Sequence, residues 1–173
     1  MPTSSPNTGN FYVGKGIVKW KGVNDVSYTD LGNAPEFLLT PAVTKLPHYS
    51  SRAGRKFRDL QIVSQVEYSF KITLDEITPT NLRLALMGSE ADSTGLVSNI
   101  GDNPQQQGAL RFVGTNDVGD KQQVDLPTVL LTTTGGVGFI QDGFMLLTLD
   151  GDITADQYGN FGVVHSEITG EIM

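Results

Sequence analysis

The fold is decided by residues 60–87, LQIVSQVEYSFKITLDEITPTNLRLALM, in which a long alternating segment leads into a short helical one. Apolar side chains recur at nearly every second position up to residue 74, and polar side chains lie between them. A period of two places the first set on one face of a strand and the second set on the other. The apolar set consists of Leu60, Ile62, Val66, Tyr68, Phe70, Ile72 and Leu74.

The residues that follow predict a helix. Thr78 is a suitable N-cap, because its hydroxyl can accept a free backbone N–H, and Pro79 fits the first helical position. Leu82, Ala85 and Leu86 form an apolar stripe that can lie on a sheet. Gly88 is expected to end the helix in the left-handed conformation. A long strand followed by a helix that packs on a sheet is an architectural unit and requires no catalytic residue.

The remainder of the chain predicts further strands separated by turns. Trp20 is expected to anchor the core or a sheet face, Pro41 favours a strand at a sheet edge, and Pro127 should interrupt its ladder. The expected fold is therefore mainly β, a β-sandwich or partial barrel with one flanking α-helix. Residues 1–10 are expected to form a flexible arm and residues 11–173 a single domain. The expected strands are 11–21, 36–43, 60–74, 108–114, 122–132, 137–150 and 161–168, with the apolar run 144–149 buried on both faces.

Composition narrows the class of protein. The 173 residues suffice for one domain, and the absence of cysteine excludes a disulfide scaffold. The first ten residues lack the basic and apolar regions of a signal peptide, and no apolar run approaches the ~20 residues of a membrane span. We therefore expect a soluble protein without membrane insertion.

The net charge of −7 is unevenly distributed, with +3 on residues 1–86 and −10 on residues 87–173. Such asymmetry suits head-to-tail association, although a simple loop bias explains it equally well.

A long polar segment at about 44–59 is the strongest candidate for a functional element. It is expected to be a loop, and loops of this length are often functional. Three interpretations remain open: a nucleic-acid contact, an exposed hairpin arm, and an assembly arm that docks on an acidic surface. The candidate contact residues are Lys45, His48, Tyr49, Arg52, Arg55, Lys56, Phe57 and Arg58.

Signals for chemistry are weak, and we expect no enzyme, no cofactor and no metal site. The two histidines, His48 and His165, have no neighbours in the sequence that suggest a catalytic set. The segment 14–16 is half of a dinucleotide fingerprint, but no helix follows it. The aspartates of segment 150–156 do not complete a calcium loop and are better explained as a solvated turn.

The order and spacing of several short motifs resemble the tail tube (major tail) proteins of long-tailed bacteriophages. The resemblance covers roughly the first half of the chain, and the second half is similar only in character. The motifs are FYVGKGIV at 11–18, DLGNAPEF at 30–37, SSRAGRK at 50–56, LDEIT at 74–78 and NLRLALMG at 81–88.

The resemblance implies a structural virion protein. Such subunits form hexameric rings in which strands of all copies join into a closed β-barrel, and the rings stack into a conduit for DNA ejection. It also implies that the 44–59 loop makes inter-subunit or inter-ring contacts and that acidic residues face the bore, where double-stranded DNA passes. The implied partners are other copies of the chain and the tail tip, tape measure and terminator proteins. The implied location is the virion tail, after synthesis in the host bacterial cytoplasm.

Other classes of protein fit part of this pattern. A tail terminator, or a tube protein of a contractile machine, would share the fold and differ in whether assembly stops at one ring. A small β-sandwich module for carbohydrate or nucleic acid would need an exposed aromatic platform, and only 8% of the residues are aromatic.

Overall fold

A computed structural model describes residues 6, 11–52, 54–89 and 99–166 of the chain. Its eight strands form one antiparallel sheet in the order β2-β1-β5-β6-β7-β4-β3, and β8 pairs with β6 beside this path. The mainly β fold with one helix is as predicted. The elements are β1 (Gly16–Gly22), β2 (Thr29–Asp30), β3 (Glu36–Ser50), β4 (Phe57–Leu74), α1 (Pro79–Ala85), β5 (Gln106–Gly114), β6 (Gln122–Leu131), β7 (Leu147–Ile153) and β8 (Val163–Ser166).

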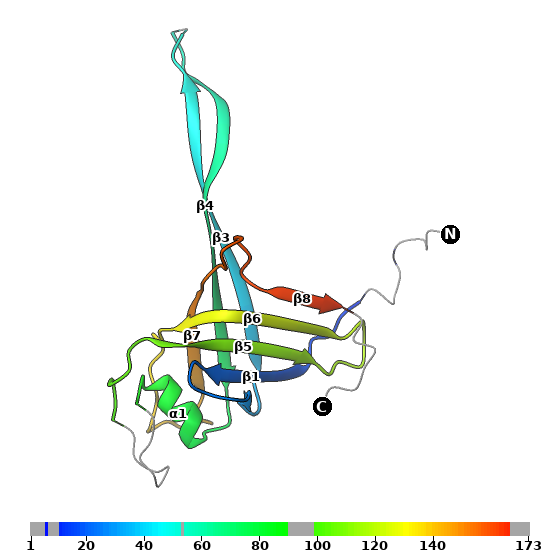
Figure 1. Cartoon of the computed structure of the whole chain (residues 1–173), viewed down its shortest axis with the longest axis vertical. Coiled ribbons are helices and arrows are strands. Elements are labelled where there is room, and N and C mark those ends of the chain that lie inside the picture. Colours follow the sequence, from blue (N-terminus) through cyan, green and yellow to red (C-terminus); the bar gives the residue numbers. More distant parts are fainter. Residues whose placement is uncertain (1–5, 7–10, 53, 90–98, 167–173) are drawn as a thin grey trace.

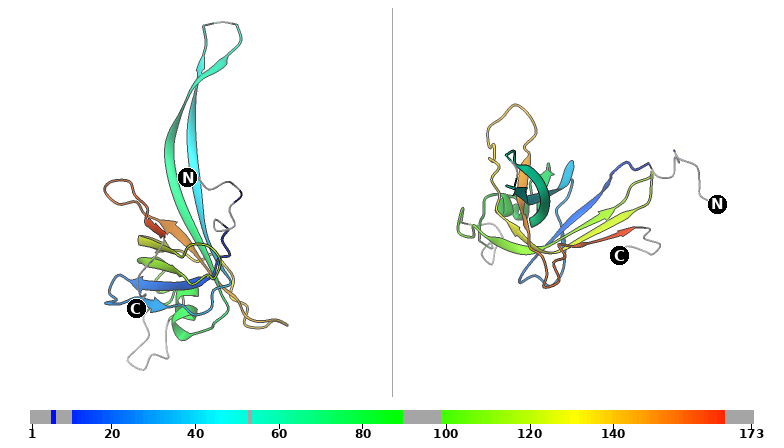
Figure 2. Two further views of the ribbon diagram at one scale, coloured as in Figure 1. Left: turned by 90° about the vertical axis from the view of Figure 1, so that its right-hand side faces the viewer. Right: turned by 90° about the horizontal axis from the view of Figure 1, so that it is seen from above.

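The sheet folds over on itself without closing, as the views in Figures 1 and 2 show. Strand β6 belongs to both halves, because residues 122–125 pair with β8 and residues 129–131 pair with β7. Between these two segments the β5–β6 register shifts, so that Gly108 lies opposite Val129 but Leu110 lies opposite Leu126. Pro127 lies at this irregularity, as its missing N–H predicts. Such a shift bends a strand and therefore allows the sheet to turn back.

The core lies in the angle between the two halves and is built from alternate residues of each strand. Trp20 is buried there, as predicted. Gly16 permits the close approach of β1 and β5, because a Cβ at this position would lie 2.6 Å from the carbonyl oxygen of Val113. The fully enclosed side chains include Val18, Phe70, Ile72, Leu74, Leu110, Val129, Leu131, Leu147 and Leu149.

Helix α1 begins as predicted and ends earlier than predicted. The Thr78 hydroxyl accepts the N–H of Asn81 at 3.1 Å, and Pro79 occupies the first turn. The left-handed residue is Met87, with φ of 52°, and not Gly88. The N–H of Gly88 then reaches back to the carbonyl oxygen of Arg83 at 2.9 Å, which closes the helix end with a Schellman pattern.

The helical contact face also differs from the predicted stripe. Ala85 is buried and Leu82 packs partly against the core, as expected for that stripe. Leu86 is the C-cap residue, and Leu84, which the prediction omitted, is buried instead. The buried helical positions are 81, 84 and 85, which are three and four residues apart and therefore share one face of the helix.

Several predicted boundaries differ from the structure, including the start of the last strand, which is Val163 and not residue 161. Strand β1 starts at residue 16, and residues 11–15 have no regular structure. Strand β7 starts at Leu147, so the apolar run 144–149 is not a strand buried on both faces, and Phe144 is 94% exposed. The segment 44–59 is mostly paired strand and not a loop, because residues 44–50 continue β3 and residues 57–59 begin β4. The predicted arm at 1–10 lies outside the described residues except for residue 6.

The alternation of residues 60–74 holds for only part of β4. Pairing with β7 places Phe70, Ile72 and Leu74 on the inner face, as predicted. Farther along, the register skips Ser64, with Thr44 opposite Gln65 and Lys45 opposite Val63. This bulge moves Leu60 and Ile62 to the face opposite that of Val66, because residues directly across an antiparallel pair share a face.

Asn81 joins the helix to the sheet and generates a stability prediction. Its buried side-chain amide donates to the carbonyl oxygens of Leu31, at 2.7 Å, and Glu76, at 2.8 Å. Asn81→Ala should lower the free energy of unfolding by about 1–3 kcal/mol, because two carbonyls lose their donor. Urea denaturation measures the effect. Asn24→Ala, at an exposed site, is the matched control, and equal effects from both variants would contradict this role.

Candidate assembly surface

The most prominent feature of the molecule is a two-stranded arm that projects from the body (Figure 1). We define the arm as residues 42–67, the part of the β3–β4 hairpin that extends beyond the last β4–β7 pair, Tyr68 with Ile153. At its base the Tyr68 ring packs against Phe161, with centroids 4.8 Å apart. Eleven residues of β4 lie in the arm, which corresponds to a projection of roughly 35 Å.

The arm exposes large apolar side chains on both faces. Val43 and Val66 are opposite each other on one face, and Leu46 and Ile62 are opposite each other on the other. An isolated two-stranded hairpin is marginally stable in water, and contiguous exposed apolar surface marks an interaction site. The exposed set, 43–59% accessible, is Val43, Leu46, Tyr49, Phe57, Leu60, Ile62, Val63 and Val66. Both faces of the arm therefore carry the exposed apolar surface that is typical of interaction sites.

The structure brings every predicted contact residue into this arm. The arm carries five Lys or Arg residues against Asp59 and Glu67, a net charge of +3, which leaves −10 on the rest of the chain. The cations gather toward the tip, where the guanidinium of Arg55 lies 5.4 Å from the centre of the Phe57 ring. The predicted residues on the arm are Lys45, His48, Tyr49, Arg52, Arg55, Lys56, Phe57 and Arg58.

Sequence reasoning concentrated on charge and missed the apolar contribution of the arm. Leu46, Val63 and Val66 were not among the predicted contact residues, yet all three are exposed, and Leu46 and Val63 have larger exposed fractions than Tyr49 and Phe57. The available signal was the apolar content of residues 60–66, which we interpreted only as one face of a strand. Only the lack of any β7 partner beyond Tyr68 distinguishes the exposed residues from the buried ones.

The two free edges of the arm are not equivalent. Strand β3 carries Pro41 and Pro47, which have no N–H to offer a further strand, and it is an edge strand as Pro41 predicted. Strand β4 contains no proline, and residues 57–67 pair only with β3. The free edge of β4 is therefore the one able to accept another strand, and the edge of β3 is protected.

A polar sheet face extends from the base of the arm. On the face opposite the core, β3, β4 and β7 present the rows Leu38–Lys71–Asp150 and Thr40–Ser69–Asp152. The Lys71 ammonium contacts a Glu36 carboxylate oxygen at 2.8 Å. That hydrogen bond lowers the pKa of Glu36, with a smaller contribution from Thr73. With Glu36, Glu67, Asp150 and Asp152 against Lys71, this polar face is net acidic.

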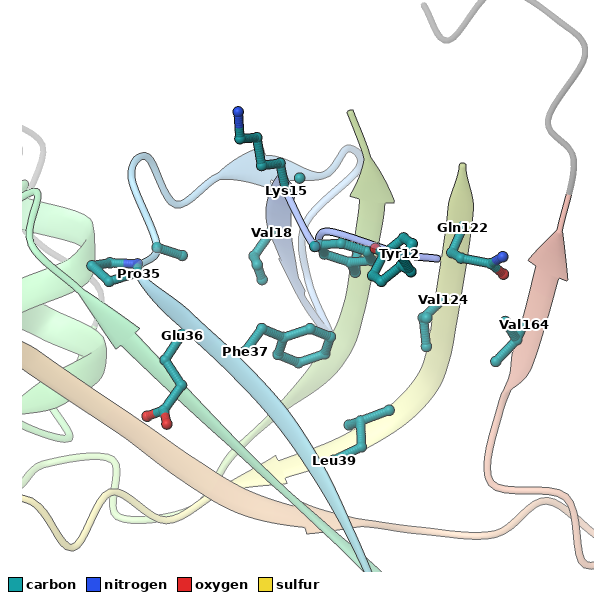
Figure 3. A pocket seen from close by; sticks show the side chains of 14 residues that line it. Tyr12, Lys15, Val18, Pro35, Glu36, Phe37, Leu39, Gln122, Val124 and Val164 are labelled. Atoms are coloured by element: carbon teal, nitrogen blue, oxygen red, sulfur yellow. The ribbon is translucent and has the colours of Figure 1, made fainter. Parts of the chain in front are cut away.

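A groove of about 510 Å³ marks the opening between the two halves of the sheet. Figure 3 shows that Phe37 and Leu39 of β3 lie across it from Val124 of β6 and Val164 of β8. The rings of Phe37 and Phe112 stack with centroids 5.6 Å apart and hold the two halves together at this point. The groove is the seam along which the sheet fails to close into a barrel.

The acidic segment 150–156 is divided between a strand and a turn. The Asp150 carboxylate accepts the N–H and the hydroxyl of Thr134, at 3.0 and 2.7 Å. Asp156 accepts the backbone N–H groups of Tyr158 and Asn160, at 2.8 and 2.9 Å, and the Asn160 bond is the main reason that the pKa of Asp156 is lowered. These carboxylates are used to fix local backbone, as expected for a turn.

Comparison with known proteins identifies the family of the chain and a solved structure that contains a similar fold. Residues 11–100, just over half of the chain, match the family described as "Protein of unknown function UCP028589", and the chain belongs to this family. No curated protein matches it. The fold is similar to that of a chain in the cryo-EM structure of the anti-feeding prophage (AFP) baseplate, 6-fold symmetrised. That match has a TM-score of 0.52 at 13% identity, over 96% of this chain and 99% of the other.

The described residues contain no helix long and apolar enough to cross a membrane.

The His48–Asp59 pair on the arm gives a pKa prediction. The ring Nδ1 of His48 lies 2.6 Å from Asp59 Oδ1, and this hydrogen bond lowers the pKa of the Asp59 carboxyl. Because the folded pKa is lowered, the stabilising contribution is present above the ordinary value of 3.8 and is lost as pH falls through the lowered value. His48→Ala should raise the pKa of Asp59 toward 3.8 in a ¹³C carboxyl NMR titration.

Asp156 serves as the internal control for this titration, since its pKa is lowered by backbone N–H groups far from His48 in the sequence. Its titration curve should be the same in both proteins. An unchanged Asp59 curve in the His48→Ala protein would show that the pair does not form in solution.

Proposed function

We propose that this protein is a structural subunit of a phage-tail-like particle and that it assembles through its arm into stacked rings around a channel. The observation that carries the proposal is the arm: a two-stranded hairpin that exposes eight large apolar side chains on both faces. The similarity of the fold to a chain of a baseplate structure supports an assembly of the same general kind.

The open sheet supports a ring. The free edge of β4 and the seam between the sheet halves offer unpaired backbone groups and apolar side chains, which are liabilities in a monomer. If a strand of each copy pairs with the free strand edge of the next copy, the unpaired backbone groups of all copies are hydrogen-bonded in one closed barrel. Hexameric rings are the expectation from the resemblance to tail tube proteins, and the six-fold symmetry of the AFP baseplate is consistent with them.

The polar face of β3, β4 and β7 suits the wall of a DNA channel. It is continuous with the arm, lies opposite the core, and carries serine, threonine and carboxylate side chains. Carboxylates repel phosphates, so double-stranded DNA would slide past such a wall without binding to it. We propose that this face lines the bore during DNA ejection in a tail tube. A tail terminator, or a related tube protein of a contractile machine, is the second candidate, and the similarity to a chain of a prophage baseplate supports the latter.

The proposed role is structural and requires no catalysis, cofactor or metal. The proposed location is the tail of a virion or virion-like particle, assembled in the bacterial cytoplasm. The proposed partners are other copies of this chain and neighbouring tail proteins such as the tip, tape measure and terminator.

A paired substitution on the arm tests the proposal. Leu46→Asp with Ile62→Asp places two like charges opposite each other on an apolar face. Both side chains are about half exposed, so thermal unfolding of the monomer should change by only a few degrees, while rings and tubes should be lost. Light scattering after size exclusion and negative-stain electron microscopy measure assembly.

Val26→Asp is the matched control, because Val26 is 94% exposed and lies away from the arm in the sequence. That variant should assemble as the wild type does. Normal rings from the Leu46→Asp, Ile62→Asp protein would overturn the role of the arm. A wild-type protein that remains monomeric at high concentration would count against self-assembly itself.

A further inference from the structure

An apolar hollow lies at the end of the body, where β4 finishes. We name it the end hollow; it has a volume of about 680 Å³ and is lined by Asn33, Asp75, Glu76, Phe144 and Leu146. Phe144 is 94% exposed and Leu146 is 49% exposed, so the apolar wall has no partner within the described part of the chain. Neighbouring Phe139 and Ile140, on the same β6–β7 connection, are also exposed.

The floor of the end hollow carries two fixed carboxylates. The Asn33 side-chain amide donates to both oxygens of Asp75, at 2.8 and 2.7 Å, and the Asn33 backbone N–H donates to Glu76 Oε2 at 3.2 Å. Neither carboxylate takes part in an ion pair among the described residues. The end hollow therefore combines exposed aromatic and aliphatic surface with two negative charges held in place.

The tip of the arm, residues 49–58, has the complementary composition. It holds four Lys or Arg residues and no Asp or Glu, together with the half-exposed rings of Tyr49 and Phe57. Tyr49 lies opposite Arg58 in the hairpin, and Arg55 lies over Phe57, so each ring adjoins a cation. Arginine pairs strongly with carboxylates, and aromatic rings bury well against apolar walls.

The two complementary surfaces lie at opposite ends of one strand. Phe57 begins β4, and Asp75 directly follows its last residue. Eighteen residues of strand span about 60 Å, so the tip cannot reach the end hollow of its own chain. Figures 1 and 2 show the arm at one end of the molecule and α1 at the other. Tip and hollow can therefore meet only between two molecules, and a head-to-tail contact between copies of this chain is of the type that can be repeated from one copy to the next.

We infer that the end hollow is the docking site for the arm tip of a second copy of this chain, the contact that joins one ring to the next. The inference rests on the proposed assembly role and adds its partner surface. Arg55, Lys56 and Arg58 approach Asp75 and Glu76, and the rings of Tyr49 and Phe57 cover Phe144 and Leu146. Charge fixes the direction of stacking, since two tips or two hollows repel each other.

Charge reversal at both ends tests the contact. The tip variant is Arg55→Glu with Lys56→Glu, the end variant is Asp75→Lys with Glu76→Lys, and a third protein carries all four substitutions. Each pair alone should raise the concentration needed for tube formation by about tenfold or more, because like charges then face each other. The four-fold variant should recover most of that loss. Sedimentation velocity and electron microscopy give both readouts, and circular dichroism checks the fold.

The control variant is Asp102→Lys with Asp120→Lys, which makes the same charge change at two exposed acidic sites outside the end hollow. It should assemble as the wild type does. If the tip variant fails and the end variant assembles normally, the tip docks elsewhere, which overturns this inference while the ring proposal stands. Failure of the four-fold variant to recover, with its fold intact, also overturns it. A wild-type chain that never associates overturns both proposals.

Discussion

The structure depends on the pairing of β4, a single strand that serves two environments. From Tyr68 to Leu74 it lies between β3 and β7, and its inner side chains are among the most deeply buried in the molecule. From Phe57 to Glu67 it has only β3 as a neighbour. The buried half of β4 fixes the direction of the exposed half, because the β3–β4 hydrogen-bonded pairing continues from one half into the other and leaves little freedom to bend between Glu67 and Tyr68. The body thus acts as the anchor of the arm.

Charge is distributed along the same axis. The arm holds +3 and the remainder holds −10, which means that the basic excess of residues 1–86 comes entirely from the arm. A uniformly acidic protein would repel its own copies. Because the cations are concentrated at one end, two copies attract each other when the basic end of one faces the acidic surface of the other. They repel each other when two basic ends meet. In the sequence, the charge asymmetry divides the chain into a basic first half and an acidic second half. In the structure, it separates the basic arm from the acidic remainder of the chain.

Local sequence signals predicted much of the body and little of the arm. The alternation of residues 68–74, the capping by Thr78 and the irregularity at Pro127 are set by chemistry within a few residues, so they could be predicted. The exposure of Ile62 and Val66 could not, because apolar alternation looks the same whether the covering surface is the protein's own core or another chain. The early helix end at Met87 escaped prediction for another reason: a non-glycine residue took the left-handed position. The eight predicted contact residues were chosen by charge and loop composition, and all of them lie on the arm, although their segment is a hairpin and not a loop.

The β3–β4 hairpin contains several features that limit which strands can pair with it. Pro41 and Pro47 remove donors from the β3 edge, so a second strand cannot pair there along its full length. The bulges at Asp59 and Ser64 shift the register and move the apolar side chains of β4 from one face to the other, so a regular flat strand cannot match the whole edge of β4 in one register. Cations at the tip repel other tips. What remains open is the edge of β4 and two apolar faces of fixed spacing, which another copy would cover in the assembly proposed above. The features that protect the subunit from aggregation are therefore the same ones on which the proposed assembly relies.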